Sequence, residues 1–326
     1  MSGATVEVAV GSELSPVKLS VRTHVEYVLL QFSNSLQLVR RIPKQTLIRA
    51  GEKDPNINEM SYNSARDELF LADEVNEVVR AMRVRNNAGD LCDVYRAPHN
   101  TFPRIRSVCH MSDLDTLLVC SLENLSNWLV ALSRNGGKWR EAHRVQTDGS
   151  GLISCALRDS RVLIGEWRSK RLELFRVESG PRITHVHRIH VPEQYYWFSA
   201  TCGSDTLVAT CGSDTLVAMC YRSDESVRLH RLRGDRLEEL ARIQLMSPYK
   251  LLWLAGRLVV ADFDENKKSY AVIELEVNDT RLERRRQLIA TSENLNVWRL
   301  CAVNDGLAII DDNNRDILHY SVLFRN

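Results

Sequence analysis

Short apolar runs alternate with polar turns along most of the chain. A run of apolar residues, often followed by an acidic or small residue, is succeeded by a polar turn and then by a second run in which apolar and polar residues alternate. Alternation of this kind predicts β-strands rather than helices. Copies of the pattern begin at seven positions: Val28, Leu69, Leu117, Val162, Leu216, Leu258 and Leu307.

The intervals between these copies define an internal repeat of about 46 residues. The one long interval, 54 residues, contains a tandem duplication, because ATCGSDTLV at 200–208 recurs at 209–217, and removing nine residues restores 45. We therefore expect a local insertion there and not a further repeat. Within 151–190, four strand-like segments follow one another: GLISCAL, RVLIGEW, RLELFRV and RITHVHRI. A period in the forties with four strands per repeat is typical of a β-propeller.

The sequence thus predicts an all-β fold, a single closed β-propeller of seven four-stranded blades spanning residues 1–326. Only 20 residues remain from Leu307 onward, which is too few for a complete last blade. The alternating run at 5–10 is expected to pair as the outer strand of that blade and close the ring, which removes two exposed sheet edges. Six and eight blades stay open as alternatives, because the first copy is the weakest and the interval after it is the shortest.

Two segments carry a family resemblance. LADEVN at 71–76, followed by VVRAMRV at 78–84, resembles the NHL-type propeller repeat, and LAIIDDN at 307–313 is similar to it; VAD at 260–262 is a looser match. The aspartate is missing at Ser121, Glu166 and Cys220, and no repeat has the paired Gly-His and Trp-Asp of the WD type. The resemblance implies a propeller. It does not choose a function, because NHL propellers include RNA binders and protein scaffolds, and related propellers include metal-dependent lactonases.

Composition narrows the cellular setting. The formal net charge of +1 gives no general reason to expect nucleic acid or a membrane surface as a partner. The N-terminus lacks the basic and apolar regions of a signal peptide, and no apolar run approaches the length of a membrane span. Eight cysteines occur without a CxxC pair, several of them inside apolar runs. These features predict a cytoplasmic or nuclear protein with reduced thiols.

Aromatic and arginine residues gather at one predicted face of the ring. In a propeller, the loops that lead from each outer strand to the next inner strand open on the same side as the turns between second and third strands. Aromatic and arginine side chains are the commonest interface anchors. The candidate partner-binding residues are Phe102, Arg104, Trp167, Arg168, Tyr195, Tyr196, Trp197, Tyr221, Arg222, Tyr249, Trp298 and Arg299. The alternative for each aromatic is packing between blades.

We therefore expect a non-catalytic scaffold that binds a protein or peptide and needs no cofactor or metal. Single-stranded RNA binding is the first alternative. A metal-dependent hydrolase is the second, for which Asn58, Glu59 and Asn296 are candidate oxygen ligands, although Arg104, Arg106, Trp197 and Leu251 occupy corresponding places in other repeats. The histidines at 185, 187 and 190 and the arginines at 284–286 are expected on exposed outer strands.

Overall fold

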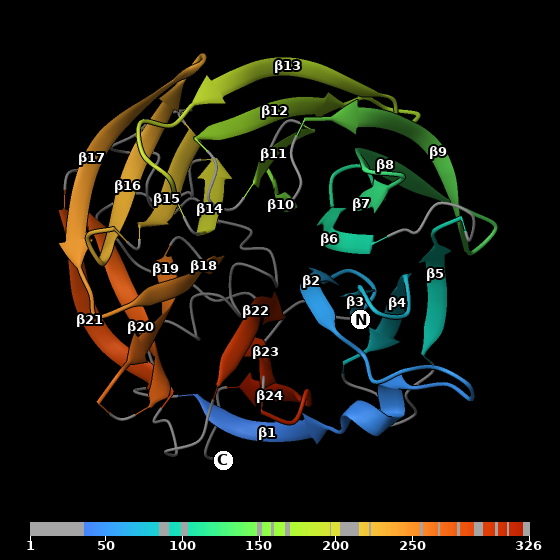
Figure 1. The fold of residues 1–326 in the computed structure, drawn as a ribbon, viewed down its shortest axis with the longest axis horizontal. Helices are drawn as coiled ribbons and strands as arrows, with labels where there is room; N and C mark the ends of the chain where they lie inside the picture. The colour runs from blue at the N-terminus through green and yellow to red at the C-terminus, as the bar shows by residue number, and fades with distance from the viewer. Residues whose placement is uncertain are drawn as a thin grey trace, which may run out of the picture.

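The computed structural model describes residues 36–321 apart from short gaps, and in this part of the chain 24 strands form six sheets. The gaps are 85–90, 99–103, 149–151, 158–159, 167–169, 196, 203–214, 222, 255–256, 267, 279–280, 290–295, 304–305 and 312. Each sheet has four antiparallel strands, and the six sheets surround a central axis (Figure 1). The fold is therefore a β-propeller, as predicted, but it has six blades instead of the predicted seven.

Each blade runs from an inner strand at the axis to an outer strand at the rim. Blade 1 consists of β2 (Ile57–Asn63), β3 (Glu68–Asp73), β4 (Val78–Arg83) and β5 (Cys92–Arg96). Blade 2 consists of β6 (Arg104–Met111), β7 (Thr116–Glu123), β8 (Ser126–Asn135) and β9 (Lys138–Thr147). Blade 3 consists of β10 (Leu152–Ala156), β11 (Arg161–Glu166), β12 (Arg171–Val177) and β13 (Ile183–His190).

The second half of the ring has the same order. Blade 4 consists of β14 (Trp197–Cys202), β15 (Thr215–Tyr221), β16 (Ser226–Arg233) and β17 (Arg236–Gln244). Blade 5 consists of β18 (Pro248–Leu254), β19 (Arg257–Asp264), β20 (Ser269–Asn278) and β21 (Arg281–Ile289). Blade 6 consists of β22 (Val297–Val303), β23 (Gly306–Asp311), β24 (Ile317–Ser321) and β1 (Gln37–Ile42). A short 3-10 helix, η1 (Lys44–Leu47), follows β1.

The prediction of seven blades is wrong by one, and the error lies in the first repeat. In the other six copies, the apolar run forms the second strand of a blade. In the copy that begins at Val28, the second half forms β1, which is an outer strand with mostly exposed side chains. A run of similar composition can serve either role, because an outer strand also needs apolar residues where it meets its neighbour.

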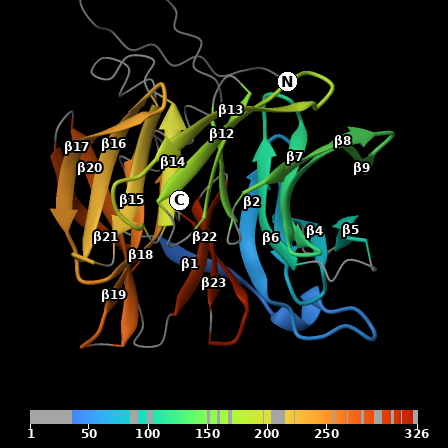
Figure 2. The ribbon, with the colours of Figure 1, turned by 45° about the horizontal axis from the view of Figure 1, so that its top comes forward.

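The ring is closed by pairing the two ends of the described chain. β1 pairs antiparallel with β24, from Gln37 opposite Ser321 to Ile42 opposite Ile317. In Figure 2 the blue strand β1 runs beside the red strands of blade 6. An N-terminal strand therefore completes the last blade, as expected, but the strand is 37–42; residues 5–10 lie outside the described residues.

Packing between blades provides the hydrophobic core. The second strands are almost entirely buried on both sides, as in β3, where Leu69 and Leu71 pack toward blade 6 while Phe70 and Ala72 pack toward blade 2. Apolar clusters fill each of the six junctions between neighbouring blades. Burial on both faces explains why these strands are near-continuous apolar runs in the sequence, and hence why they were the clearest signal of the fold.

The aspartates of the NHL-like motif have a structural role in this protein. Asp73 and Asp311 end the second strands of blades 1 and 6, and Asp262 lies two residues before the end of that of blade 5. Each accepts a hydrogen bond from at least one backbone amide of the segment that leads into the inner strand of the same blade. Asp262, for example, binds the amides of Ser247 at 2.8 Å and Met246 at 3.3 Å. We call the side of the ring that carries these three residues the Asp face.

In the described residues the duplicated segment contributes to the two strands β14 and β15 of blade 4. The first copy begins in β14 and the second copy ends in β15, which pair in unbroken register from Trp197 opposite Cys220 to Cys202 opposite Thr215. Residues 203–214, between these strands, lie outside the described residues. The expected local insertion is confirmed, since blade 4 keeps four strands.

The histidines at 185, 187 and 190 and the arginines at 284–286 also lie on outer strands, as expected. The three histidines are exposed on β13. Residues 284–286 belong to β21, where Arg286 pairs with Glu274 at 2.6 Å.

Of the helices in the described residues, none is long and apolar enough to cross a membrane.

Asp262→Ala is expected to lower the free energy of unfolding by about 1–3 kcal/mol, because it removes the acceptor of two part-buried hydrogen bonds from the amides of residues 246 and 247. Asp264→Ala is the matched control, since its carboxylate accepts the amide of Asn266 in an exposed turn. Denaturant unfolding of both variants measures the difference. Equal losses of free energy of unfolding in the two variants would show that the hydrogen bonds from residues 246 and 247 to Asp262 contribute little to stability.

Candidate functional site

The inner strands enclose a cavity at the axis of the ring. Its volume is about 220 Å³, and side chains of five blades line it. The inner strands contact one another in a closed order around this space. The lining residues are Glu59, Met60, Ser61 and Tyr62 of β2, Val108, Cys109 and His110 of β6, Trp197, Phe198 and Ser199 of β14, Lys250, Leu251 and Leu252 of β18, and Leu300, Cys301 and Ala302 of β22. We call this space the channel cavity.

Three charged side chains stand at equivalent positions near the Asp face. In β2, β18 and β22 a register shift follows the first residue, and the first paired residue after it is Glu59, Lys250 or Arg299. A bulge re-aims the side chains next to it. Because blades 5, 6 and 1 are consecutive around the ring, the bulges bring one carboxyl group and two cations together.

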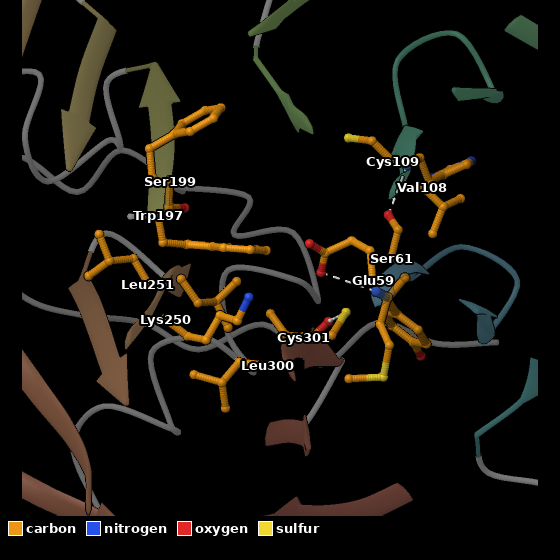
Figure 3. Close-up of a pocket in the computed structure, with 16 residues that line it drawn as sticks. Glu59, Ser61, Val108, Cys109, Trp197, Ser199, Lys250, Leu251, Leu300 and Cys301 are labelled. Carbon is orange, nitrogen blue, oxygen red and sulfur yellow. Dashed lines mark hydrogen bonds between the residues drawn. The ribbon is translucent and has the colours of Figure 1, made fainter. Parts of the chain in front are cut away.

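Lys250 lies against the face of an indole ring. Its Nζ is 2.7 Å from the centroid of the Trp197 ring, and the guanidinium carbon of Arg299 is 5.3 Å from the same centroid. The Nε of Arg299 donates a hydrogen bond to the backbone oxygen of Asn58. Figure 3 shows Glu59 and Trp197 extending toward one another from opposite walls, with Lys250 beneath the indole. Both cations therefore lie close to the indole of Trp197, which lines the cavity.

Burial shifts the pKa values of Lys250 and Glu59 in the directions that favour their uncharged forms. Only 2% of Lys250 is exposed, and burial lowers the pKa of its ammonium well below the ordinary value; Arg299 adds to the effect and Glu59 opposes it. Burial raises the pKa of the Glu59 carboxyl, against the attraction of Arg299 and Lys250. Perturbed pKa values in a cavity are typical of functional sites.

The arrangement suits an anion better than a metal ion. A hard cation needs several oxygen ligands, and of the three predicted ones only Glu59 lines the cavity. The side chain of Asn58 bonds Glu74 at 2.8 Å, and the backbone of Asn296 bonds Asp311. In the described residues no cluster of three or more His, Cys, Asp or Glu side chains could hold a metal, and the two cations would repel one.

A second hollow opens on the Asp face between blades 4 and 5. Its volume is about 400 Å³. Tyr270 is central to it, with its ring 5.8 Å from that of Tyr249 and 4.9 Å from that of Phe263. Glu225 and Glu265 complete the wall together with Ser247 and Pro248. We call this hollow, lined by those seven residues, the inter-blade pocket.

The structure separates the predicted partner-binding residues into groups. Trp197 lines the channel cavity with Arg299 close to its ring, Tyr249 lines the inter-blade pocket, and Arg104 is exposed beside Glu74. Trp298 belongs to β22, and its side chain is outside the described part. The remaining positions outside the described residues are Phe102, Trp167, Arg168, Tyr196 and Arg222.

Tyr195 and Tyr221 are packed between blades. Both are 1% exposed within the cluster that joins blades 3 and 4. The hydroxyl of Tyr195 donates to the backbone oxygen of Arg171 at 2.8 Å. Arg228 stacks 4.0 Å from the centroid of the Tyr221 ring while it bonds Glu193. The structure therefore gives these two tyrosines the alternative role considered for the aromatic set.

Sequence reasoning overlooked Lys250 and most of the inter-blade pocket. A signal for Lys250 was present, because a charged residue inside the apolar run PYKLLWL must be buried or must face the axis. Glu59 and Arg299 interrupt their inner strands in the same way. No comparable signal marks Phe263 and Tyr270, because their proximity depends on the hairpin between β19 and β20.

No protein-family model matches the chain, and no curated protein matches it. Solved structures are similar in fold. They include a protein from Lactobacillus plantarum (10% identity, TM-score 0.58, 85% of this chain and 86% of that chain covered) and a streptogramin B lyase (13% identity, TM-score 0.54, 89% and 88% covered). A chain of a mitotic checkpoint complex is also similar (10% identity, TM-score 0.56, 98% and 99% covered). Similarity at this identity establishes the propeller fold alone.

Gly165→Ala is expected to destabilise the junction of blades 3 and 4 by about 1–3 kcal/mol. A Cβ at this position would lie 2.3 Å from the Tyr195 hydroxyl and 2.6 Å from Phe198. Tyr195→Phe removes the nearest atom. In denaturant unfolding, the loss of free energy of unfolding in the double variant should therefore be smaller than the sum of the losses in the two single variants. Additive losses would mean that the two residues do not compete for space.

Lys250→Met is expected to raise the free energy of unfolding near neutral pH by about 1–4 kcal/mol, because it replaces a buried cation with an apolar chain of similar length. The unfolded chain binds a proton at Lys250 more readily than the folded protein does, so wild-type stability should fall as the pH drops below 10.5. The variant should lack this part of the pH dependence.

Urea unfolding of both proteins at about pH 7 and about pH 9.5 measures the two effects. The free energy of unfolding of wild type should rise with pH more steeply than that of the variant, by up to about 1.4 kcal/mol per pH unit. Lys138→Met, at an exposed position of β9, is the control. A Lys250 variant that is less stable than wild type, with an unchanged pH slope, would contradict the assignment of a costly buried ammonium.

Proposed function

We propose that the protein is a non-catalytic β-propeller that binds a basic segment of a partner protein on its Asp face. The observation that carries the proposal is the inter-blade pocket, in which three aromatic rings and two carboxylates surround one hollow. Aromatic faces attract ammonium and guanidinium groups, and the attraction grows as the cation is desolvated. Carboxylates at the wall add charge complementarity.

The walls of the pocket are fixed before a partner arrives. The amide of Phe263 donates to the backbone oxygen of Ser247 at 3.1 Å, and the amide of Leu245 donates to that of Glu225 at 2.9 Å. Asp262 holds the same loop from below through the amide of Ser247. A site with so little freedom loses little conformational entropy on binding, which favours affinity for a flexible peptide.

The electrostatics favour a basic peptide over the alternatives. The charged residues lining the inter-blade pocket, Glu225 and Glu265, are acidic and would repel the phosphates of RNA. At the channel cavity, Lys250 and Arg299 oppose the divalent ion that a lactonase-like hydrolase would require. Together these charges support the scaffold role and weaken both alternatives.

The proposal predicts that a labelled glycine-serine peptide with a central arginine or lysine binds more tightly than the same peptide with norleucine. The expected ratio is about 2- to 30-fold, the equivalent of about 0.5–2 kcal/mol. Fluorescence anisotropy with wild type, Phe263→Ala and Glu265→Gln measures it, and both variants should remove the preference. Glu283→Gln, exposed on the outer strand β21, is the control.

Equal binding of the basic and norleucine peptides would refute a cation-binding pocket. A labelled oligouridylate that binds wild type, with an affinity that falls steeply as salt is raised, would instead support the RNA-binding alternative. Phe263 is partly buried and Glu265 is exposed, so both variants are expected to stay folded, which circular dichroism melting checks.

A further inference from the structure

The channel cavity contains a buried cation that the described residues do not neutralise by direct contact. Among the residues that the structure describes, the side chain of Lys250 makes no hydrogen bond or ion pair, and its ammonium lies 2.7 Å from the centroid of the Trp197 ring and 5.0 Å from that of the Tyr249 ring. An ammonium that is almost fully buried without an acceptor is costly. Its nitrogen nevertheless lies at the wall of the cavity, where a bound molecule could reach it (Figure 3).

Arg299 places a second positive charge beside the cavity, near the Trp197 indole, although it is not one of the residues that line the cavity. Its guanidinium carbon and the Lys250 nitrogen are at most about 8 Å apart, the sum of their distances to the Trp197 centroid. At that distance the charge of Arg299 strengthens the attraction of an anion that Lys250 holds in the cavity. The like charges raise each other's free energy, so an anion near both relieves a repulsion as well as supplying an acceptor.

The rest of the cavity suits an organic body rather than a bare inorganic ion. Met60, Leu300 and Cys301 contribute apolar surface beside the indole of Trp197. The cavity volume of about 220 Å³ is enough for a molecule of a few carbon atoms. Glu59, held in place by the amide of Met60 at 3.1 Å, faces this volume with a carboxyl group that burial favours in its protonated form.

We propose that the channel cavity binds a small organic acid, with its carboxylate bound by Lys250 close to the charge of Arg299 and its body against Trp197. A hydroxyl group next to the carboxylate would exchange a hydrogen bond with Glu59. This site is separate from the inter-blade pocket and shares no lining residue with it. Binding of an organic acid and binding of a basic peptide can therefore succeed or fail independently.

Binding of the acid is expected to be coupled to the uptake of a proton by Lys250. At a pH where Lys250 is unprotonated in the empty protein, an incoming carboxylate stabilises the ammonium, and one proton moves from solvent to the Lys250 nitrogen as the acid binds. The charged and titratable groups around Lys250 are Glu59 and Tyr62 on β2, Cys109 and His110 on β6, Cys220 on β15, Tyr249 on β18, and Arg299 and Cys301 on β22. Of these, Glu59 and Arg299 exert the largest electrostatic effects on Lys250.

Titration with acetate and glycolate, followed by intrinsic fluorescence, tests the site. Both acids should give a saturable change that is absent from Trp197→Phe, and glycolate should bind at least about threefold more tightly than acetate through Glu59. Lys250→Met should weaken both by about tenfold or more, whereas Glu59→Gln should mainly reduce the advantage of glycolate. Lys138→Met is the control, since that lysine is exposed on β9.

Calorimetry in two buffers of different ionisation enthalpy should show proton uptake on binding to wild type and none in Lys250→Met. Absence of a saturable change with either acid, or equal affinity in wild type and Lys250→Met, would overturn the proposal. Binding of sodium sulfate with the same affinity and the same dependence on Lys250 would also overturn it, because the site would then be a general anion site.

Discussion

Burial of the second strand of each blade on both faces is the constraint on which the rest of the molecule depends. A strand such as β3 has one set of side chains in the preceding junction and the alternate set in the following one. No single blade can bury both sets alone, so the sheets are stable only as neighbours, and six junctions require a closed ring. The pairing of β1 with β24 is then a necessity of the core, because an open ring would expose the junction between blades 6 and 1.

Closure fixes the inner strands, and with them the chemistry of the axis. Side chains of inner strands from every direction compete for a small central space, so a charged residue there meets other residues instead of water. The bulges that follow the first residues of β2, β18 and β22 give consecutive blades the same geometry. Equivalent positions thereby form a cluster, in which burial is the main cause of the shifted pKa values of Glu59 and Lys250 and the neighbouring charges modify them.

The features that could be predicted from sequence are those that follow from strand burial. The apolar runs from Leu69 onward identified the second strand of every blade, and the interruption in blade 4 was correctly separated from the repeat. The count failed at Val28 because composition alone does not distinguish a second strand from an outer one. The site was harder to predict, because the depth of Tyr195 and the meeting of Phe263 with Tyr270 depend on how neighbouring segments pack. Local sequence has no record of that packing.

The two proposed sites differ in their contributions to the stability of the fold. The inter-blade pocket is built from half-buried rings and hydrogen-bonded turns, which contribute to stability whether or not a partner binds. Lys250 is the opposite case, since an apolar residue would fit its surroundings better than an ammonium does. Residues that violate the consistency of a fold are expected at functional positions, where the cost is offset by what the residue does. Among the described charged groups that line the cavity, Lys250 is therefore one whose presence packing does not explain, and the proposed organic acid would supply the acceptor that its ammonium lacks.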